Sequence, residues 1–189
     1  MLNRFLSFHR NATTDFTVKL VLSIALLCTL GPLVLDMKGS LPITLQSLVV
    51  LFCAIAFGWR IGLAAILTYL AVGALGLHVF AGYKGGYESF MSPSGGFFFG
   101  FVAATLICGF LSELDAFQKT IPAIMLWFIG HAIILLLGFF WLARLDPGWK
   151  EKLMAVLPGA AIKSIVGALF IQLIKKFMTR KPREKAFRD

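Results

Sequence analysis

The sequence has few charged residues for its length. Only 14% of its 189 residues are charged, whereas 59% are hydrophobic, and the mean hydropathy is +0.86. A soluble domain of this size carries about 25% charged and about 45–50% apolar residues. The shortage of charge argues against a soluble enzyme, a disulfide-stabilised mini-protein and a disordered chain. It predicts one integral membrane domain over residues 1–189.

Motifs for several kinds of catalysis are also missing. The chain has no G-x-x-x-x-G-K-[ST] loop for ATP, no H-E-x-x-H zinc motif and no G-x-S-x-G nucleophile motif. Its cysteines lie inside apolar stretches, its histidines lie far apart, and neither set has the spacing of a metal site. We therefore predict a binding or transport protein that is not an enzyme and has no metal or cofactor. The residues concerned are Cys28, Cys53, Cys108, His9, His78 and His131.

Apolar residues gather in six segments, at 17–35, 42–58, 61–77, 95–112, 121–143 and 153–178. A membrane-spanning helix needs about 20 apolar residues, with a usable minimum of about 17. The segments predict an all-α membrane protein, a bundle of six transmembrane helices. The second and third are separated only by Trp59 and Arg60, which predicts a tight helical hairpin. Pro158 is expected to begin the last helix, because proline suits the first helical position.

The net charge of +9 does not indicate a nucleic-acid partner, because its distribution is that of a membrane flank. A basic run at 175–188 directly follows the last apolar segment. With six spans, twelve Lys and Arg residues lie on the side of the termini and five on the opposite side. Loops with an excess of Lys and Arg residues remain on the cytoplasmic side of the membrane. We therefore expect a cytoplasmic N-terminus at 1–16 and a basic cytoplasmic tail at 179–189.

Small residues recur at helical spacing in two of the predicted helices. Gly96, Gly100, Ala104 and Cys108 are four residues apart and form one stripe. Close backbone approach over small residues stabilises helix pairs in lipid. The stripe therefore predicts a packing face, although a helix that is merely rich in glycine would look similar. Ala25 and Thr29 form a weaker pair of the same kind in the first helix.

Lys163 is the most informative residue, because it lies inside the last apolar segment. A lysine at the centre of a membrane helix costs roughly 2.5–3.5 kcal/mol on insertion scales, so such residues are usually functional. Lys163 lies about 7.5 Å along the helix axis from Pro158. With both termini in the cytoplasm, this position is near the outer side of the membrane. Gly159 and Gly167 share its helix face and leave space around it. Lys163 could extend to the outer headgroups, but we favour an anion-binding lysine that faces the bundle interior.

Two outer segments carry further candidate ligand contacts. The loop at 78–94 mixes glycines with Phe80 and Tyr87, so it could cover a flat organic ligand or be an ordinary interfacial loop. Thr44 and Gln46 open the second helix and could hydrogen-bond a ligand. Their spacing alone favours a helix cap or a bridge between helices.

An ordered set of motifs over most of the chain resembles the BioY family of biotin-binding membrane subunits. These are S components of energy-coupling-factor (ECF) transporters. The set comprises Pro42-Ile43-Thr44-Leu45-Gln46, Gly58-x-x-x-Gly62, Tyr69-x-x-x-Gly73-x-x-Gly76-x-x-Val79-Phe80, Gly85-Gly86, Ser92-Pro93-Ser94-Gly95-Gly96-Phe97-x-x-Gly100-Phe101 and Pro158-Gly159-x-x-Ile162-Lys163.

The resemblance implies a six-helix S component that binds biotin near its outer face and mediates biotin uptake across a bacterial inner membrane. It implies a transmembrane coupling subunit and a pair of ATPases as partners, although some members of the family act alone. The first helix would then meet the partner through Ala25 and Thr29. The resemblance also assigns ligand contacts to Lys163 and, in the outer loop, to Phe80, Gly82, Gly86 and Tyr87.

Two positions depart from the family pattern. The family has Asp directly after the Pro-Gly pair, where this chain has Ala160, and Pro before Val-Phe, where it has His78. The missing Asp removes an expected acceptor for the ureido N–H groups of biotin. An S component for another vitamin, an orphan intramembrane enzyme and a structural membrane subunit therefore remain as alternatives.

Overall fold

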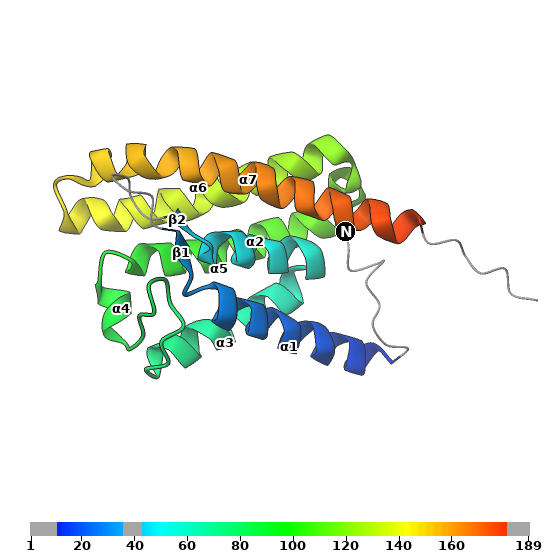
Figure 1. The fold of residues 1–189 in the computed structure, drawn as a ribbon, viewed down its shortest axis with the longest axis horizontal. Helices are drawn as coiled ribbons and strands as arrows, with labels where there is room; N and C mark the ends of the chain where they lie inside the picture. The colour runs from blue at the N-terminus through cyan, green and yellow to red at the C-terminus, as the bar shows by residue number, and fades with distance from the viewer. Residues whose placement is uncertain (1–10, 36–42, 181–189) are drawn as a thin grey trace, which may run out of the picture.

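The computed structural model describes residues 11–35 and 43–180, and α-helices make up most of them (Figure 1). Most of the expected N-terminal segment 1–16, Pro42 of the first motif and the basic tail from residue 181 lie outside the described residues. The helices are α1 (Ala12–Leu30), α2 (Gln46–Phe57), α3 (Trp59–Ala74), α4 (Glu88–Met91), α5 (Gly95–Glu113), the 3₁₀ helix η2 (Asp115–Gln118), α6 (Thr120–Leu145) and α7 (Trp149–Arg180). Two short antiparallel strands, β1 (Val34–Leu35) and β2 (Ile43–Thr44), precede α2.

The predicted fold class is confirmed, because one longer helix stands at each of the six predicted segments. Four of these helices, α1, α5, α6 and α7, are long and apolar enough to cross a membrane. The other two, α2 and α3, are shorter apolar helices of 12 and 16 residues. In Figure 1, α2 and α5 lie between an α1–α3 pair and an α6–α7 pair. The four-residue helix α4 belongs to the loop between α3 and α5.

The predicted hairpin of α2 and α3 is present, but its turn lies one residue earlier than expected. Gly58 has a φ of +87°, a conformation that glycine adopts without steric cost. Its N–H donates to Ala54 O at 3.0 Å and ends α2. Trp59 and Arg60, which we expected in the link, therefore form the first turn of α3.

The prediction that Pro158 begins the last helix is wrong. Helix α7 starts at Trp149 and continues through Pro158. Proline removes one N–H from the helical ladder. The apolar residues before it still satisfy their own backbone best as a helix, because a bilayer offers no other partners. The missing bond therefore does not end the helix.

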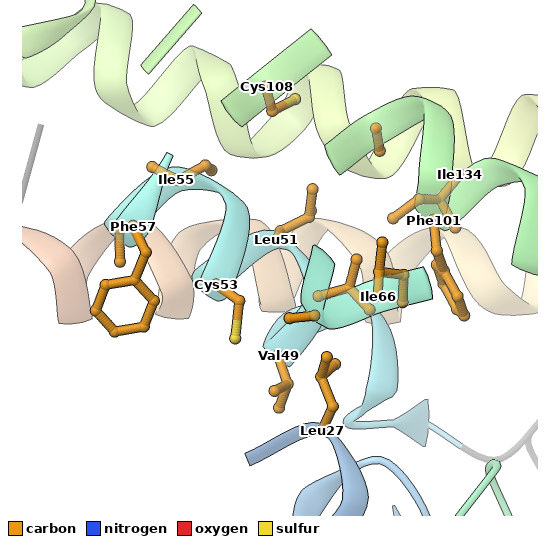
Figure 2. Close-up of a cluster of buried hydrophobic side chains, with 14 of the residues drawn as sticks. Leu27, Val49, Leu51, Cys53, Ile55, Phe57, Ile66, Phe101, Cys108 and Ile134 are labelled. Carbon is orange, nitrogen blue, oxygen red and sulfur yellow. The ribbon is translucent and has the colours of Figure 1, made fainter. Parts of the chain in front are cut away.

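The core is centred on α2, which has ten of its twelve residues buried. Figure 2 shows α2 side chains such as Leu51 and Cys53 packed among residues of α1, α3, α5 and α6. Cys53 and Cys108 are buried free thiols, as expected of small core residues, and Cys28 is half-buried. A helix that other helices surround in this way has little contact with lipid.

The predicted small-residue stripe on α5 is confirmed as a packing face, and its partner is α6. A Cβ atom added at Gly100 would lie 2.9 Å from Ile134 Cα, and one added at Gly96 would collide with Trp141 Cβ. Ala104 and Cys108 continue the stripe and are fully buried. The two helix backbones therefore approach as closely as the absence of side chains allows.

Candidate functional site

A cavity of about 270 Å³ opens among the N-terminal end of α2, the start of α5, the middle of α6 and the N-terminal half of α7. Its volume is close to the lower limit of about 300 Å³ for small-ligand pockets. Polar and apolar residues of these helices line it, together with one residue of β2 and two loop residues. They are Thr44, Gln46, Ser47, Ala81, Ser94, Phe97, Phe98, Phe101, His131, Ile134, Leu135, Ala155, Val156, Gly159, Ala160 and Lys163.

Lys163 reaches into the bundle from α7. Its Nζ donates to Ser47 Oγ at 2.7 Å and lies 3.4 Å from the carbonyl oxygen of Thr44. Thr44 is held there by the β1–β2 pair, in which it lies opposite Val34, and Ser47 is in the first turn of α2. The ammonium group therefore sits at the cavity wall between α2 and α7, where an anionic group of a ligand could reach it.

Gln46 connects the cavity to the loop after α3. Its Nε2 donates to the Tyr69 hydroxyl at 2.8 Å, and that hydroxyl donates to Val79 O at 2.7 Å. Gln46 and Tyr69 are both buried. This chain of hydrogen bonds fixes the start of α2 and the start of the loop relative to each other.

The rest of the cavity wall is mostly apolar. Phe97, Phe98 and Phe101 come from the first two turns of α5, and Ile134 and Leu135 come from α6. The rings of Phe98 and Phe101 lie 6.1 Å apart, centroid to centroid. A cavity with one cation and a wall of aromatic and aliphatic side chains suits an organic anion with an apolar body.

His131 also lines the cavity, although its sequence context does not predict a ligand contact by any metal-site spacing. The residue is 4% exposed, and its Nδ1 lies 2.9 Å from Ser164 Oγ and 3.1 Å from Trp127 O. Its Nε2 is buried and has no hydrogen-bond partner among the described residues. A signal was available, because a histidine inside an apolar helix is unusual for the same reason as Lys163.

The structure brings Lys163, Thr44 and Gln46 together, but it places the predicted loop residues outside the cavity lining. Phe80 is buried behind the wall, with its ring 4.6 Å from that of Phe98. Gly82 and Gly86 have positive φ angles of 74° and 88° and shape the loop. Tyr87 is exposed, and its ring stacks on Phe90. Their predicted ligand contacts stay predictions, and Ala81 and Ser94 are the residues of this loop that line the cavity.

The turn between α6 and α7 is held by Asp146. Its carboxylate accepts hydrogen bonds from the Lys152 ammonium and, at 2.8 Å, from the Gly148 N–H. These bonds, led by that from Lys152, hold the pKa of Asp146 below its usual range. The turn fixes the start of α7, which contributes Ala155 and Val156 to the cavity.

The predicted partner contacts lie on the outward face of α1. Ala25 and Thr29 are both exposed, and the Thr29 hydroxyl donates to Ala25 O at 2.7 Å. The hydroxyl is therefore satisfied within the helix and does not oppose contact with a neighbouring helix. Among the described residues, no group of three His, Cys, Asp or Glu side chains could hold a metal ion.

The arrangement of the helices matches a known membrane fold. The structure superposes on the crystal structure of the S-component for biotin from an ECF-type ABC transporter with a TM-score of 0.71. The two chains are 23% identical, and the match covers 89% of this chain and 95% of the other. The fold is thus that of an S component, an all-α membrane protein.

Sequence comparison then gives the family. Residues 6–180 match the model of the BioY family. A protein of Pyrococcus horikoshii described as "Probable biotin transporter BioY" is 33% identical over 75% of this chain and 83% of its own length. "Biotin transporter BioY" of Rhizobium etli is 34% identical over 68% of this chain and 74% of its own length. The chain belongs to the BioY family.

Proposed function

We propose that this chain is the biotin-binding membrane subunit of a biotin uptake system. Its relatives are named as biotin transporters rather than as enzymes. The observation that carries the proposal is the position of Lys163 Nζ, at the wall of a largely apolar cavity in an S-component fold. In this proposal biotin is the transported ligand, and the chain uses no cofactor.

In the proposed binding mode, the cation of the cavity binds one end of biotin and the aromatic wall packs against the other. The valerate carboxylate would accept a charge-assisted hydrogen bond from Lys163 Nζ, close to Ser47 and Thr44. The fused rings would pack against the aromatic residues of α5. Gln46 would hold the α2 end of the wall in place through Tyr69.

Binding of radiolabelled biotin to the purified chain tests this function. We expect saturable binding that unlabelled biotin displaces and that unlabelled thiamine or riboflavin does not displace. Retention of another vitamin in place of biotin would identify an S component of different specificity. Retention of no vitamin would favour a structural subunit or an orphan enzyme.

Coupling to partner subunits is a further part of the proposal. We propose that a transmembrane coupling subunit, carrying a pair of ATPases, docks on the outward face of α1 at Ala25 and Thr29. Small exposed side chains allow a partner helix to approach closely, which is the packing that lipid favours.

Ala25→Trp is expected to reduce biotin uptake by cells severalfold while leaving biotin binding by the purified chain unchanged. The bulky ring would hold the partner helix away from α1 but would not touch the cavity. Ala71→Trp, at an exposed alanine of α3, is the matched control and should leave both measurements unchanged. Equal loss of uptake and binding would indicate misfolding, and unchanged uptake would indicate a chain that acts alone.

The orientation in the cell membrane follows from the charge distribution. We propose that both termini face the cytoplasm and that the α3–α5 loop, with its exposed Lys84, faces outward. In a variant without the three native cysteines, a membrane-impermeant thiol reagent should label Lys84→Cys in intact cells but not Lys185→Cys. The reverse pattern would show the opposite orientation.

A further inference from the structure

The buried histidine of α6 is a polar group of the cavity that the proposed function leaves without a role. His131 is 4% exposed, and its ring lies between Trp127 on its own helix and Ser164 on α7. One ring nitrogen, Nδ1, faces both of these residues. The other, Nε2, is buried and unpartnered within the described part of the chain.

The neighbours of Nδ1 determine which nitrogen carries the proton. A carbonyl oxygen can only accept a hydrogen bond, so the contact of 3.1 Å with Trp127 O is a hydrogen bond in the tautomer that carries its hydrogen on Nδ1, and we assign this tautomer. Ser164 fits this tautomer, because its hydroxyl donates to Ala160 O at 2.9 Å and leaves a lone pair toward Nδ1. In the neutral ring Nε2 then carries a lone pair and is a hydrogen-bond acceptor.

The surroundings of Nε2 indicate what it accepts from. His131 and Ala160 both line the cavity, and the Ser164 hydroxyl contacts both of them, at His131 Nδ1 and at Ala160 O. Ala160, Lys163 and Ser164 are at positions i, i+3 and i+4 of α7 and so share one helix face. The cavity therefore offers a cation and a neutral acceptor to the same ligand. Its complement is a ligand that carries both an anionic group and an N–H donor.

We infer that His131 Nε2 is a ligand-binding atom that accepts a hydrogen bond from a ureido N–H of biotin, and that Ser164 is the residue that positions the ring. The inference rests on the proposed function, which supplies the ligand. A buried acceptor without a partner destabilises a protein, so most such groups are hydrogen-bonded. The bound ligand supplies the missing donor.

The test measures equilibrium binding of two compounds to the purified full-length chain. One is biotin, and the other is biotin methylated on both ureido nitrogens, which has no N–H to donate. His131→Phe keeps the ring but removes the acceptor, and His131→Gln restores an acceptor oxygen near the Nε2 position. His78→Phe, at an exposed histidine outside the cavity, is the matched control.

We expect His131→Phe to weaken biotin binding about ten- to hundredfold, because a buried N–H of the ligand loses its acceptor. Binding of the dimethyl compound should change little, so the discrimination between the two ligands should shrink by the same factor. His131→Gln should bind biotin more tightly than His131→Phe. Ser164→Ala should weaken biotin binding about threefold, because the ring is then held by one contact instead of two.

Wild-type affinity for biotin in His131→Phe, beside a loss in Lys163→Ala, would overturn the inference and leave the proposed function standing. Equal weakening of both ligands in His131→Phe would assign a purely structural role to the histidine and would also overturn it. If neither variant of His131 elutes as a folded protein, Ser164→Ala decides, and unchanged discrimination there refutes the inference. A wild-type chain that binds no biotin would refute the proposed function itself.

Discussion

Lys163→Ala is expected to weaken biotin binding by about 30-fold to several thousand-fold without loss of folded protein. Removing one partner of a buried charge pair typically costs about 2–5 kcal/mol, because the other charge remains buried and unpaired. At about 1.4 kcal/mol per tenfold change in affinity, this cost corresponds to binding that is weaker by about 30-fold to several thousand-fold. Equilibrium binding of radiolabelled biotin to purified wild type and variant measures it.

The assignment of the carboxylate to Lys163 has its own control. Wild type should bind biotin amide much more weakly than biotin, whereas Lys163→Ala should discriminate little between the two. Lys150→Ala removes an exposed cation from the same helix outside the cavity and should bind like wild type. Lys163→Arg should also bind poorly, because a planar guanidinium needs different space from an ammonium group. Wild-type affinity in Lys163→Ala would mean that the lysine does not hold the ligand.

Gly100→Leu is expected to lower the stability of the bundle by about 1–3 kcal/mol, a typical cost of overpacking. Its Cβ would lie 2.9 Å from Ile134 Cα and 3.0 Å from Ile134 O. Both are backbone atoms of α6, so the two helices must separate to make room. Thermal unfolding of the purified chain in detergent should show a midpoint several degrees lower.

Ala103→Leu is the matched control for this packing prediction. Ala103 is on the same helix and lines an open apolar hollow between α3 and α5, so a larger side chain has space there. Its unfolding midpoint should stay near that of wild type. Equal midpoints for Gly100→Leu and wild type would show that the contact of α5 with α6 is not tight.

The helices were predictable because their signal is local. Apolar runs of sufficient length form helices in a bilayer whatever they pack against, which is why a helix occupies most of each of the six segments. The errors lie at boundaries, at Pro158 and at Trp59–Arg60. There the backbone conformation of single residues such as Gly58, rather than hydrophobicity, decides where a helix ends.

The site was only partly predictable because it is built from long-range contacts. Lys163 stands out as a charge in an apolar segment, but its partner Ser47 lies 116 residues away in sequence. No spacing rule relates two such positions. The aromatic residues of α5 become part of a cavity wall only because the fold places α6 and α7 around the same cavity. His131 obeys the same physical rule as Lys163, but a neutral histidine carries a weaker signal than a buried charge.

The shortness of α2 has a consequence for how deep a ligand rests. Twelve helical residues extend about 18 Å, whereas the hydrocarbon layer of a bilayer is about 30 Å thick. Because α2 is surrounded by other helices, lipid does not need to thin around it. The cavity lies at the first turn of α2, where Thr44, Gln46 and Ser47 line it. In the proposed binding mode, the number of turns in this central helix thus sets the distance between the ligand and the bilayer midplane.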